Sequence, residues 1–254
     1  MTKVIISGAK GKMGRSIAQL TKRRQDINIV AGVDLTGEEG ELIIYDDIFK
    51  ISQEADVILD FSRPNALGNL CKYAVERRIA LVVGTTGLTE QHKQRLKEAS
   101  DTVPVFLSSN MSLGVFLMMN LAKQAASVLR EFDIEIIERH HNQKIDAPSG
   151  TALMIADAIK EVRKESHYVL GRSEKSQKRE ENEIGIHAIR AGNLVGEHSV
   201  IFGGENEVIE INHVMTSREA LAAGALRAAK FTALQKPGFY SMSDLARQIQ
   251  NLQA

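Results

Sequence analysis

The first 111 residues alternate between strand-like and helix-like segments, and this alternation restricts the possible folds more than any other feature. Short apolar runs, typical of strands buried on both faces, recur at Val4–Ile6, Ile27–Val33, Val57–Leu59, Leu81–Val83 and residues 103–107. Helical segments are expected between them, including residues 65–77 with Ser62 as N-cap and residues 90–99 with Thr89 as N-cap. The alternation predicts a parallel, doubly wound sheet with helices on both faces.

A glycine-rich turn joins the first strand to the first helix. Gly8, Gly11 and Gly14 are spaced Gly-x-x-Gly-x-x-Gly, which differs from the commoner Gly-x-Gly-x-x-Gly. In a Rossmann-type domain these glycines allow a tight turn, the approach of a pyrophosphate, and close packing of helix on strand. We therefore predict that a dinucleotide binds to the residues of this turn, namely Gly8, Ala9, Lys10, Gly11, Lys12 and Met13.

Asp34 follows the second strand, about 20 residues after the glycine turn, where such domains place an acidic residue on the adenosine ribose. The next residue is Leu35, so no arginine is at hand for a 2′-phosphate. NADH is therefore the preferred cofactor in our interpretation, with NADPH as the alternative, which Lys10 or Lys12 would favour. The competing interpretation of Asp34 is an ordinary turn residue at a strand end.

The ends of the later strands supply further candidates, because ligands of doubly wound sheets lie beyond the carboxyl ends of the strands. The segment 60–62 lies at one such end, and small or hydroxyl residues mark two others. The predicted nicotinamide-side contacts are Gly84, Thr85, Thr86, Ser108, Ser109, Asn110 and Met111. Taken alone, a short run such as Gly84–Thr86 is more often just a turn.

The second half of the chain has a different organisation. After a helix over residues 113–129, strand-like runs at 184–190, 198–202 and 208–213 follow one another without helices between them. This pattern predicts a second, α+β domain with a mixed or antiparallel sheet. We expect a dinucleotide-binding domain of residues 1–111 plus about 220–254, a second domain of residues 112–219, and a ligand cleft between them. The polar segment 165–183 is expected to be a long exposed loop.

Glu138–Thr151 concentrates the groups suited to chemistry. His140, His141 and Lys144 are expected in a connection between a strand and a helix. Ser149 can cap that helix, and Gly150–Thr151 would present bare N–H groups that suit an anion. The stretch thus combines proton donors, a cation and, at Ser149, Gly150 and Thr151, a cradle for an anion, which predicts chemistry on a small carboxylated substrate.

Two rival functions use the same residues. A nucleotide-sensing module would need the glycine turn but no acid in a second domain. A zinc hydrolase would use His140, His141 and His187 or His198. Adjacent histidines on a strand point apart, and the usual ligand spacings are missing, so we predict no metal site.

Composition excludes some partners and suggests a compartment. Basic and acidic residues both number 32, so neither nucleic acid nor an anionic membrane is implied. Cys71 is the single cysteine; we interpret it as a core residue in a reducing compartment. The apolar run at the N-terminus is too short for a signal peptide or a membrane span, so we expect a cytoplasmic protein.

Four segments, in order along nearly the whole chain, together resemble the 4-hydroxy-tetrahydrodipicolinate reductase (dihydrodipicolinate reductase) family of bacterial lysine and diaminopimelate biosynthesis. They are Gly8–Gly14, Gly84–Gly87, Glu138–Ala152 and Arg190–His198. The string His-His-x-x-Lys-x-Asp-Ala-Pro-Ser-Gly-Thr-Ala is specific to that family. The resemblance implies NAD(P)H-dependent reduction of 4-hydroxy-tetrahydrodipicolinate to tetrahydrodipicolinate with loss of water. It also implies a homotetramer built on the C-terminal sheet, and last helices that return to the cofactor domain.

The resemblance also implies residue roles. His140 matches the family's proton donor or acceptor and Lys144 its second donor, whereas His141 and Gly150–Thr151 match groups that hold the substrate carboxylates. The nucleotide contacts correspond to the glycine turn, Asp34, residues 84–86 and residues 108–111. Many members carry Glu-Arg in place of Asp34-Leu35, and their arginine can meet a 2′-phosphate, so its absence here puts strong NADPH use in doubt. The segment 108–111 also departs from the family's more common aromatic ending.

Overall fold

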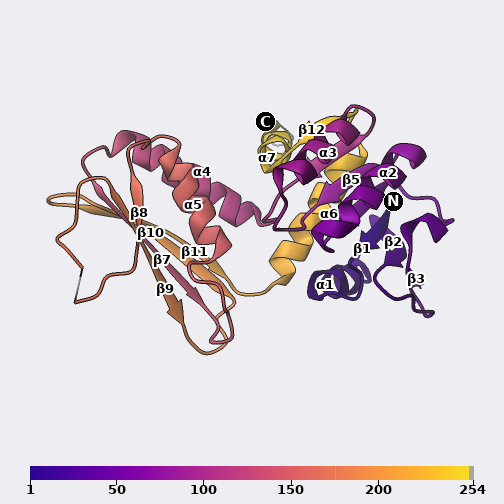
Figure 1. Ribbon diagram of the computed structural model, residues 1–254, viewed down its shortest axis with the longest axis horizontal. Coiled ribbons are helices and arrows are strands. Elements are labelled where there is room, and N and C mark those ends of the chain that lie inside the picture. The colour runs from indigo at the N-terminus through magenta and orange to yellow at the C-terminus, as the bar shows by residue number, and fades with distance from the viewer. Residues whose placement is uncertain (175, 252–254) are drawn as a thin grey trace. The chain divides into compact units, whose positions relative to one another are not determined.

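The computed structural model describes residues 1–174 and 176–251. The chain divides into two compact units. Unit 1 comprises Met1–Met111 and Glu219–Ala254, and unit 2 comprises Ser112–Arg218. Figure 1 labels the helices and strands of both units.

Unit 1 is built on a seven-stranded sheet in the order β12-β6-β5-β4-β1-β2-β3, in which every pair of neighbours is parallel. Its strands are β1 (Thr2–Ser7), β2 (Ile27–Val33), β3 (Ile44–Tyr45), β4 (Val57–Asp60), β5 (Ala80–Val83), β6 (Pro104–Leu107) and β12 (Gly238–Tyr240). Because both faces of this sheet are covered, the central strands are apolar throughout, and the side chains of Val4, Ile5 and Ile6 are completely buried. The predicted doubly wound parallel sheet is confirmed.

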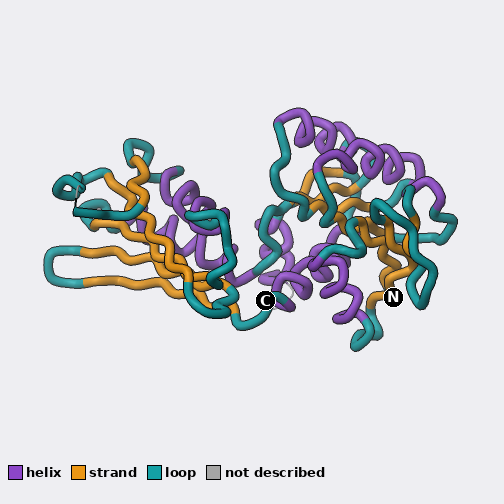
Figure 2. Tube along the Cα trace, turned by 60° about the horizontal axis from the view of Figure 1, so that its bottom comes forward, coloured by secondary structure: helices purple, strands orange, loops and turns teal. Residues whose placement is uncertain are grey.

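Helices cover the sheet of unit 1 on both faces (Figure 2). They are α1 (Lys12–Thr21), α2 (Leu67–Arg77), α3 (Glu90–Ser100), α6 (Glu219–Ala233) and α7 (Met242–Asn251), with 3-10 turns η1 (Ile48–Lys50) and η2 (Pro64–Ala66). Helix α6 packs against β4, β5 and β6 through small residues, and a Cβ on its Gly224 would lie 1.7 Å from the carbonyl oxygen of Met111. Cys71 is buried in this core, as predicted, and burial raises the pKa of its thiol to about 11.

Unit 2 contains a five-stranded mixed sheet in the order β11-β10-β7-β9-β8. Its strands are β7 (Asp133–His140), β8 (His167–Leu170), β9 (Glu183–Arg190), β10 (Gly196–Gly203) and β11 (Val208–Met215), and its helices are α4 (Leu113–Val128) and α5 (Gly150–Lys160). Strand β10 is antiparallel to β7 and β11, whereas β9 is parallel to β7 and β8. The two helices pack on each other over one face of the sheet, where Ile136, Ile186, Val200 and Phe202 form the core. The predicted mixed sheet is therefore confirmed.

The segment predicted as an exposed loop, residues 165–183, is partly structured. It contains β8, a short edge strand of sequence His-Tyr-Val-Leu that pairs with β9 and lies within an otherwise polar segment. Arg179 then ties the following residues to the sheet, because its guanidinium contacts the carboxylates of Asp133 and Glu135. Long-range ion pairs of this kind leave no periodic signal in the sequence, so the loop prediction was wrong for this stretch.

Other expectations about local structure had mixed outcomes. Thr89 caps α3 by accepting a hydrogen bond from the backbone N–H of His92, as predicted. Ser62 is no helix cap, because its hydroxyl donates to Asp60 and a proline-led 3-10 turn precedes α2. The short edge strands β3 and β12 were not predicted.

Candidate active site

The two adjacent histidines belong to different elements: one ends strand β7, and the other begins the loop that follows it. His140 is the last residue of β7, and the loop 141–149 joins it to helix α5. Because side chains alternate along a strand, Glu138 and His140 share a face, the one covered by α4 and α5. Glu138 is completely buried there, and the His140 side chain is only 12% exposed. The prediction that both histidines lie in the connection was therefore wrong for His140.

Glu138 is the centre of a hydrogen-bond network. Its Oε2 lies 2.6 Å from Nδ1 of His140 and 2.8 Å from Nη1 of Arg190. Its Oε1 accepts from Nη2 of Arg190 at 2.7 Å and from the backbone N–H of Ser149 at 3.0 Å. Burial alone raises the pKa of Glu138, but the hydrogen bonds, with that of Arg190 foremost, outweigh burial and hold this pKa below its ordinary value.

Helix α5 starts at Gly150, with Ser149 as its N-cap. The Ser149 hydroxyl oxygen accepts from the N–H of Ala152 at 3.1 Å, as predicted, and lies 3.1 Å from Nε2 of His198. A Cβ at Gly150 would meet no atom within 4 Å, so the space beside this helix start is open. Backbone N–H groups at such an end carry the positive pole of the helix dipole, which favours a carboxylate.

Lys144 lies in the loop, and its side chain is 20% exposed. Its Nζ lies 2.7 and 2.9 Å from the two carboxylate oxygens of Asp146, and this ammonium holds the pKa of Asp146 below its usual value. The carbonyl of Asp146 accepts in turn from Nη2 of Arg190 at 2.7 Å. Arg190 therefore connects the lysine-bearing loop to Glu138.

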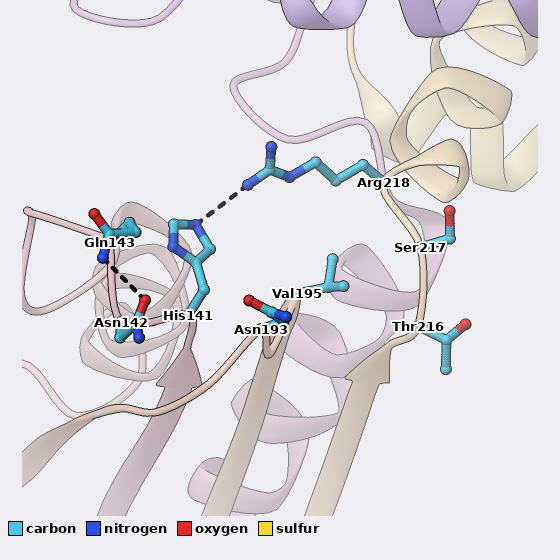
Figure 3. A pocket seen from close by; sticks show the side chains of 8 residues that line it. All are labelled: His141, Asn142, Gln143, Asn193, Val195, Thr216, Ser217 and Arg218. Atoms are coloured by element: carbon cyan, nitrogen blue, oxygen red, sulfur yellow. Dashed lines mark hydrogen bonds between the residues drawn. The ribbon is translucent and has the colours of Figure 1, made fainter.

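His141 lies apart from this network, at a pocket of about 420 Å³ in unit 2 (Figure 3). Residues 141–143, Asn193, Val195 and residues 216–218 line the pocket. Nη2 of Arg218 points at Nε2 of His141, 3.2 Å away. Because a guanidinium only donates, Nε2 of His141 is the acceptor in this contact.

In unit 1, the glycine turn has the shape that a dinucleotide needs. Gly8 has a φ of +79°, a conformation that suits glycine. A Cβ on Gly14 would lie 2.4 Å from the carbonyl oxygen of Gly8 and 2.7 Å from that of Ala9, so helix α1 fits against the turn only with glycine at this position. Gly11 precedes α1, and the start of this helix can therefore face a pyrophosphate. These residues fit NADH or NADPH.

Replacing Gly14 with alanine is expected to disturb this fit. Backbone crowding of this kind costs about 1–3 kcal/mol, so NADH should bind roughly tenfold or more weakly. Calorimetric titration with NADH measures the effect. Gly40→Ala is the matched control, since its Cβ would meet nothing within 4 Å and binding should not change. Wild-type affinity in Gly14→Ala would contradict the assignment of the turn.

Asp34 is held at the end of β2 by the turn itself. Its Oδ2 accepts from the backbone N–H of Lys10 at 2.8 Å, and its Oδ1 accepts from that of Leu35 at 2.8 Å. The ammonium of Lys10 lies 3.0 Å from Oγ1 of Thr36 and 3.2 Å from a carboxylate oxygen of Glu38. The acidic side chain is thus fixed beside the glycine turn.

The remaining candidates of unit 1 lie after strands β5 and β6. Gly84 borders the ring of Phe61, which a Cβ would approach to 2.2 Å, and the Thr85 hydroxyl donates to the buried Asp60 at 2.7 Å. Burial raises the pKa of Asp60, although hydroxyl hydrogen bonds oppose the rise. Met111 is buried under α6 and leaves its side chain little access to a ligand. Thr86 and Ser109 are exposed, while Ser108 and Asn110 are half-buried.

Several residues of the network had no role assigned from the sequence. Glu138 was seen only as part of the motif, and Arg190 only as part of a family segment. Arg190 lies 52 residues from Glu138 in the chain, and His198 lies 49 residues from Ser149. The sequence carries one usable signal for Glu138: an acidic residue two positions before a functional histidine on the same strand shares its face.

Residues 1–174 and 176–251 contain neither a metal-binding cluster nor a membrane-spanning helix. Within these ranges, no group of three or more histidine, cysteine, aspartate or glutamate side chains is placed to hold a metal ion. Within the same ranges, no helix has both the length and the apolar character needed to cross a membrane.

Comparison with known proteins gives consistent matches over both units. The family profile described as dihydrodipicolinate reductase, N-terminus, matches residues 2–111, and that described as its C-terminus matches residues 114–246. The 4-hydroxy-tetrahydrodipicolinate reductase of Caldanaerobacter subterraneus subsp. tengcongensis is 51% identical over 249 residues, covering 98% of this chain and 99% of the relative. That of Clostridium novyi is 46% identical, covering 97% and 99%.

Solved structures agree. A dipicolinate-bound dihydrodipicolinate reductase from Paenisporosarcina sp. TG-14 superposes with a TM-score of 0.79 at 27% identity, covering 95% of this chain and 97% of that one. The DAP dehydrogenase of C. glutamicum, at 15% identity and a TM-score of 0.59, shares the fold alone. The two family profiles together cover almost the whole chain, and the two relatives named above are 51% and 46% identical to it. The chain therefore belongs to the dihydrodipicolinate reductase family.

Proposed function

We propose that this chain reduces 4-hydroxy-tetrahydrodipicolinate to tetrahydrodipicolinate, consuming NAD(P)H and a proton and releasing water, in lysine and diaminopimelate biosynthesis. Family membership supports the activity, since both relatives described above carry the name of this reductase. One observation carries the assignment of the site: an acid–base histidine, an ammonium group and a capped helix start meet within residues 140–151. A doubly anionic ring needs this combination.

Each residue of the loop has a proposed task. Bound NADH or NADPH supplies a hydride to a ring carbon of the substrate. His140 delivers or accepts a proton at Nε2, the ring nitrogen that does not face Glu138. Loss of the substrate hydroxyl as water needs an acid of this kind. Lys144 pairs with one substrate carboxylate in place of Asp146 and acts as the second proton donor.

The second substrate carboxylate is proposed to lie at the start of α5. Backbone N–H groups of Gly150 and Thr151 would bind it, with Ser149 holding the helix start in place through its cap. His141 completes the set of substrate ligands. The Paenisporosarcina relative, whose structure holds dipicolinate, supports a planar dicarboxylate as the class of ligand.

A turnover assay tests the proposed activity. Purified protein is incubated with NADH and 4-hydroxy-tetrahydrodipicolinate, and the loss of nicotinamide absorbance is followed. The rate should persist in the presence of a chelator, which a zinc hydrolase would not tolerate. A nucleotide sensor would bind NADH without consuming it, so the absence of turnover would overturn the proposal.

NADH is proposed as the preferred cofactor, with NADPH also accepted. Asp34 faces the turn with its carboxylate, and no arginine follows it to bind a 2′-phosphate. Asp34→Ala should therefore weaken NADH about tenfold, the scale of one hydrogen bond to a charged group, and weaken NADPH less. The ratio of the two KM values measures the change. A larger loss for NADPH than for NADH would refute the ribose assignment.

A homotetramer built through the sheet of unit 2 is also proposed, in a cytoplasmic setting. Helices α4 and α5 cover one face of this sheet (Figure 1), and residues of the other face include Ile137, Ile189, Ile201 and Val214. Ile189 and Val214 expose 42% and 58% of their surface. These aliphatic side chains lie among charged ones such as Glu135, Arg139 and Glu197, and this mixed face is proposed as the surface that other copies of the chain cover.

A further inference from the structure

Glu138 is the most deeply buried acidic side chain of the site, with no exposed surface. A buried carboxylate is costly unless charged and hydrogen-bonding partners surround it. The mechanism proposed above gives Glu138 no contact with substrate or cofactor. Its burial two residues before His140 therefore points to a role that acts through its neighbours.

The carboxylate makes two kinds of contact at once. One oxygen accepts from Nδ1 of His140 and the other from the backbone N–H of Ser149, while Arg190 donates to both. A single planar group thus joins the proton-transferring ring to the helix start that is proposed to hold a substrate carboxylate. Arg190 extends the connection by holding the carbonyl of Asp146 in the loop that carries Lys144.

The contact with Glu138 decides which nitrogen of His140 is reactive. An ionised carboxylate only accepts, so the proton of the neutral ring lies on Nδ1 and the lone pair lies on Nε2. Nε2 is also the nitrogen that lies over Gly196, where a Cβ would come within 3.1 Å of it. The glycine leaves space at the ring atom that must exchange a proton.

We propose that Glu138 is a positioning residue for the reductase reaction. It holds His140 in the Nδ1–H tautomer and fixes the distance between Nε2 and the anion-binding start of α5, while Arg190 holds the carboxylate of Glu138 in place. The role rests on the proposed function. It extends the set of functional residues to a buried pair that touches no substrate.

Glutamine is the decisive substitution, because it keeps the shape of Glu138 and removes its charge. Each carboxylate oxygen faces two donors: His140 and Arg190 on one side, Ser149 and Arg190 on the other. The NH₂ group of glutamine would therefore confront donors whichever way the amide is turned. If the NH₂ group faces His140, Nδ1 must become an acceptor and the ring proton moves to Nε2; if it faces Ser149, the backbone N–H of Ser149 loses its acceptor.

The test combines kinetics with a double-mutant cycle. Glu138→Gln should lower kcat about 10–100-fold, by analogy with the loss of a hydrogen-bond partner that orients a metal-binding histidine, and leave the KM for NADH unchanged. In a His140→Gln background the same change should lower kcat less than threefold, because the ring to be positioned is gone. An equal loss in both backgrounds would mean a general structural role and would overturn the proposal.

The tautomer gives a second readout, independent of turnover. In ¹⁵N NMR spectra of the wild-type protein with labelled histidine, the neutral ring of His140 should show a protonated Nδ1 and an unprotonated Nε2. A proton found on Nε2 instead would overturn the proposal, even if Glu138→Gln failed to fold. Since this measurement needs no substrate, it also separates failure of this inference from failure of the proposed function, which the wild-type turnover assay tests.

The chain offers a matched control on the same strand. Glu135 lies three residues earlier, on the opposite face of β7, and its carboxylate contacts Nε2 of His187 at 2.8 Å. Glu135→Gln also disrupts a carboxylate–imidazole pair, but away from His140, so kcat should stay within twofold of the wild-type value. If Glu135→Gln lowered kcat as much as Glu138→Gln, disruption of any carboxylate–imidazole pair on β7 would impair turnover, and the specific role proposed for Glu138 would be overturned.

Discussion

His140→Gln is expected to lower kcat by about 10²–10⁴-fold, the usual cost of removing one acid–base group, while NADH affinity survives. The physical reason lies in the ring's surroundings. Nδ1 of His140 is engaged by Glu138, which leaves Nε2 to exchange a proton with the substrate. A glutamine side chain can still reach Glu138 but cannot carry a titrating proton at the position of Nε2.

Steady-state kinetics of the variant, with NADH titrated separately, measures both parts of this prediction. His167→Gln is the matched control, since this exposed histidine begins the edge strand β8 away from residues 138–151. It should turn over like the wild type. If His140→Gln lost NADH affinity in proportion to its rate, the histidine would be supporting the cofactor and not the proton transfer.

The second large effect concerns stability at acid pH. His198 is buried beside Ser149 and His140, its ring lies 5.4 Å from that of His140, and burial lowers its pKa from 6.5 to about 4. The folded protein therefore keeps this ring neutral in a range where the unfolded chain binds a proton. Above pH 6.5 the stabilisation is fully present; it is lost progressively as the pH falls from about 6.5 to about 4.

The size of this effect follows from the shift. One pKa unit corresponds to about 1.4 kcal/mol, so the free energy of unfolding should fall by about 3 kcal/mol over this range because of His198. Denaturant unfolding at a series of pH values measures it. His198→Gln should flatten the slope, because glutamine does not titrate, whereas His167→Gln should keep it. An unchanged slope in His198→Gln would assign the acid sensitivity to other groups.

The parts of the structure that follow from local rules could be predicted. Residues 1–111 alternate between buried apolar runs and helical periods, and this order leads to the parallel sheet because each strand must be covered on both faces. The N-cap at Ser149 was also predictable, because a hydroxyl oxygen directly before a helical run can accept from a free N–H of the first turn. Such signals depend on neighbours within a few positions.

The parts that were missed depend on distant partners. Strand β8 is a four-residue run inside a polar segment and is fixed by its pairing with β9, and β12 extends the first sheet from the far end of the chain. The hydrogen bonds of Arg190 to Glu138 join residues far apart in sequence. No spacing in the sequence predicts such a pair, although the motif had located both histidines and the lysine.

The central claim is that residues 140–151 receive a dicarboxylate, and ligand-dependent stability tests it most directly. Pyridine-2,6-dicarboxylate should raise the thermal unfolding midpoint of the wild-type protein, as a ligand of the folded state does. Lys144→Met should lose most of this shift, because one carboxylate loses its ammonium partner, whereas Gly14→Ala should retain it. Equal stabilisation of the wild type and of Lys144→Met would contradict the account.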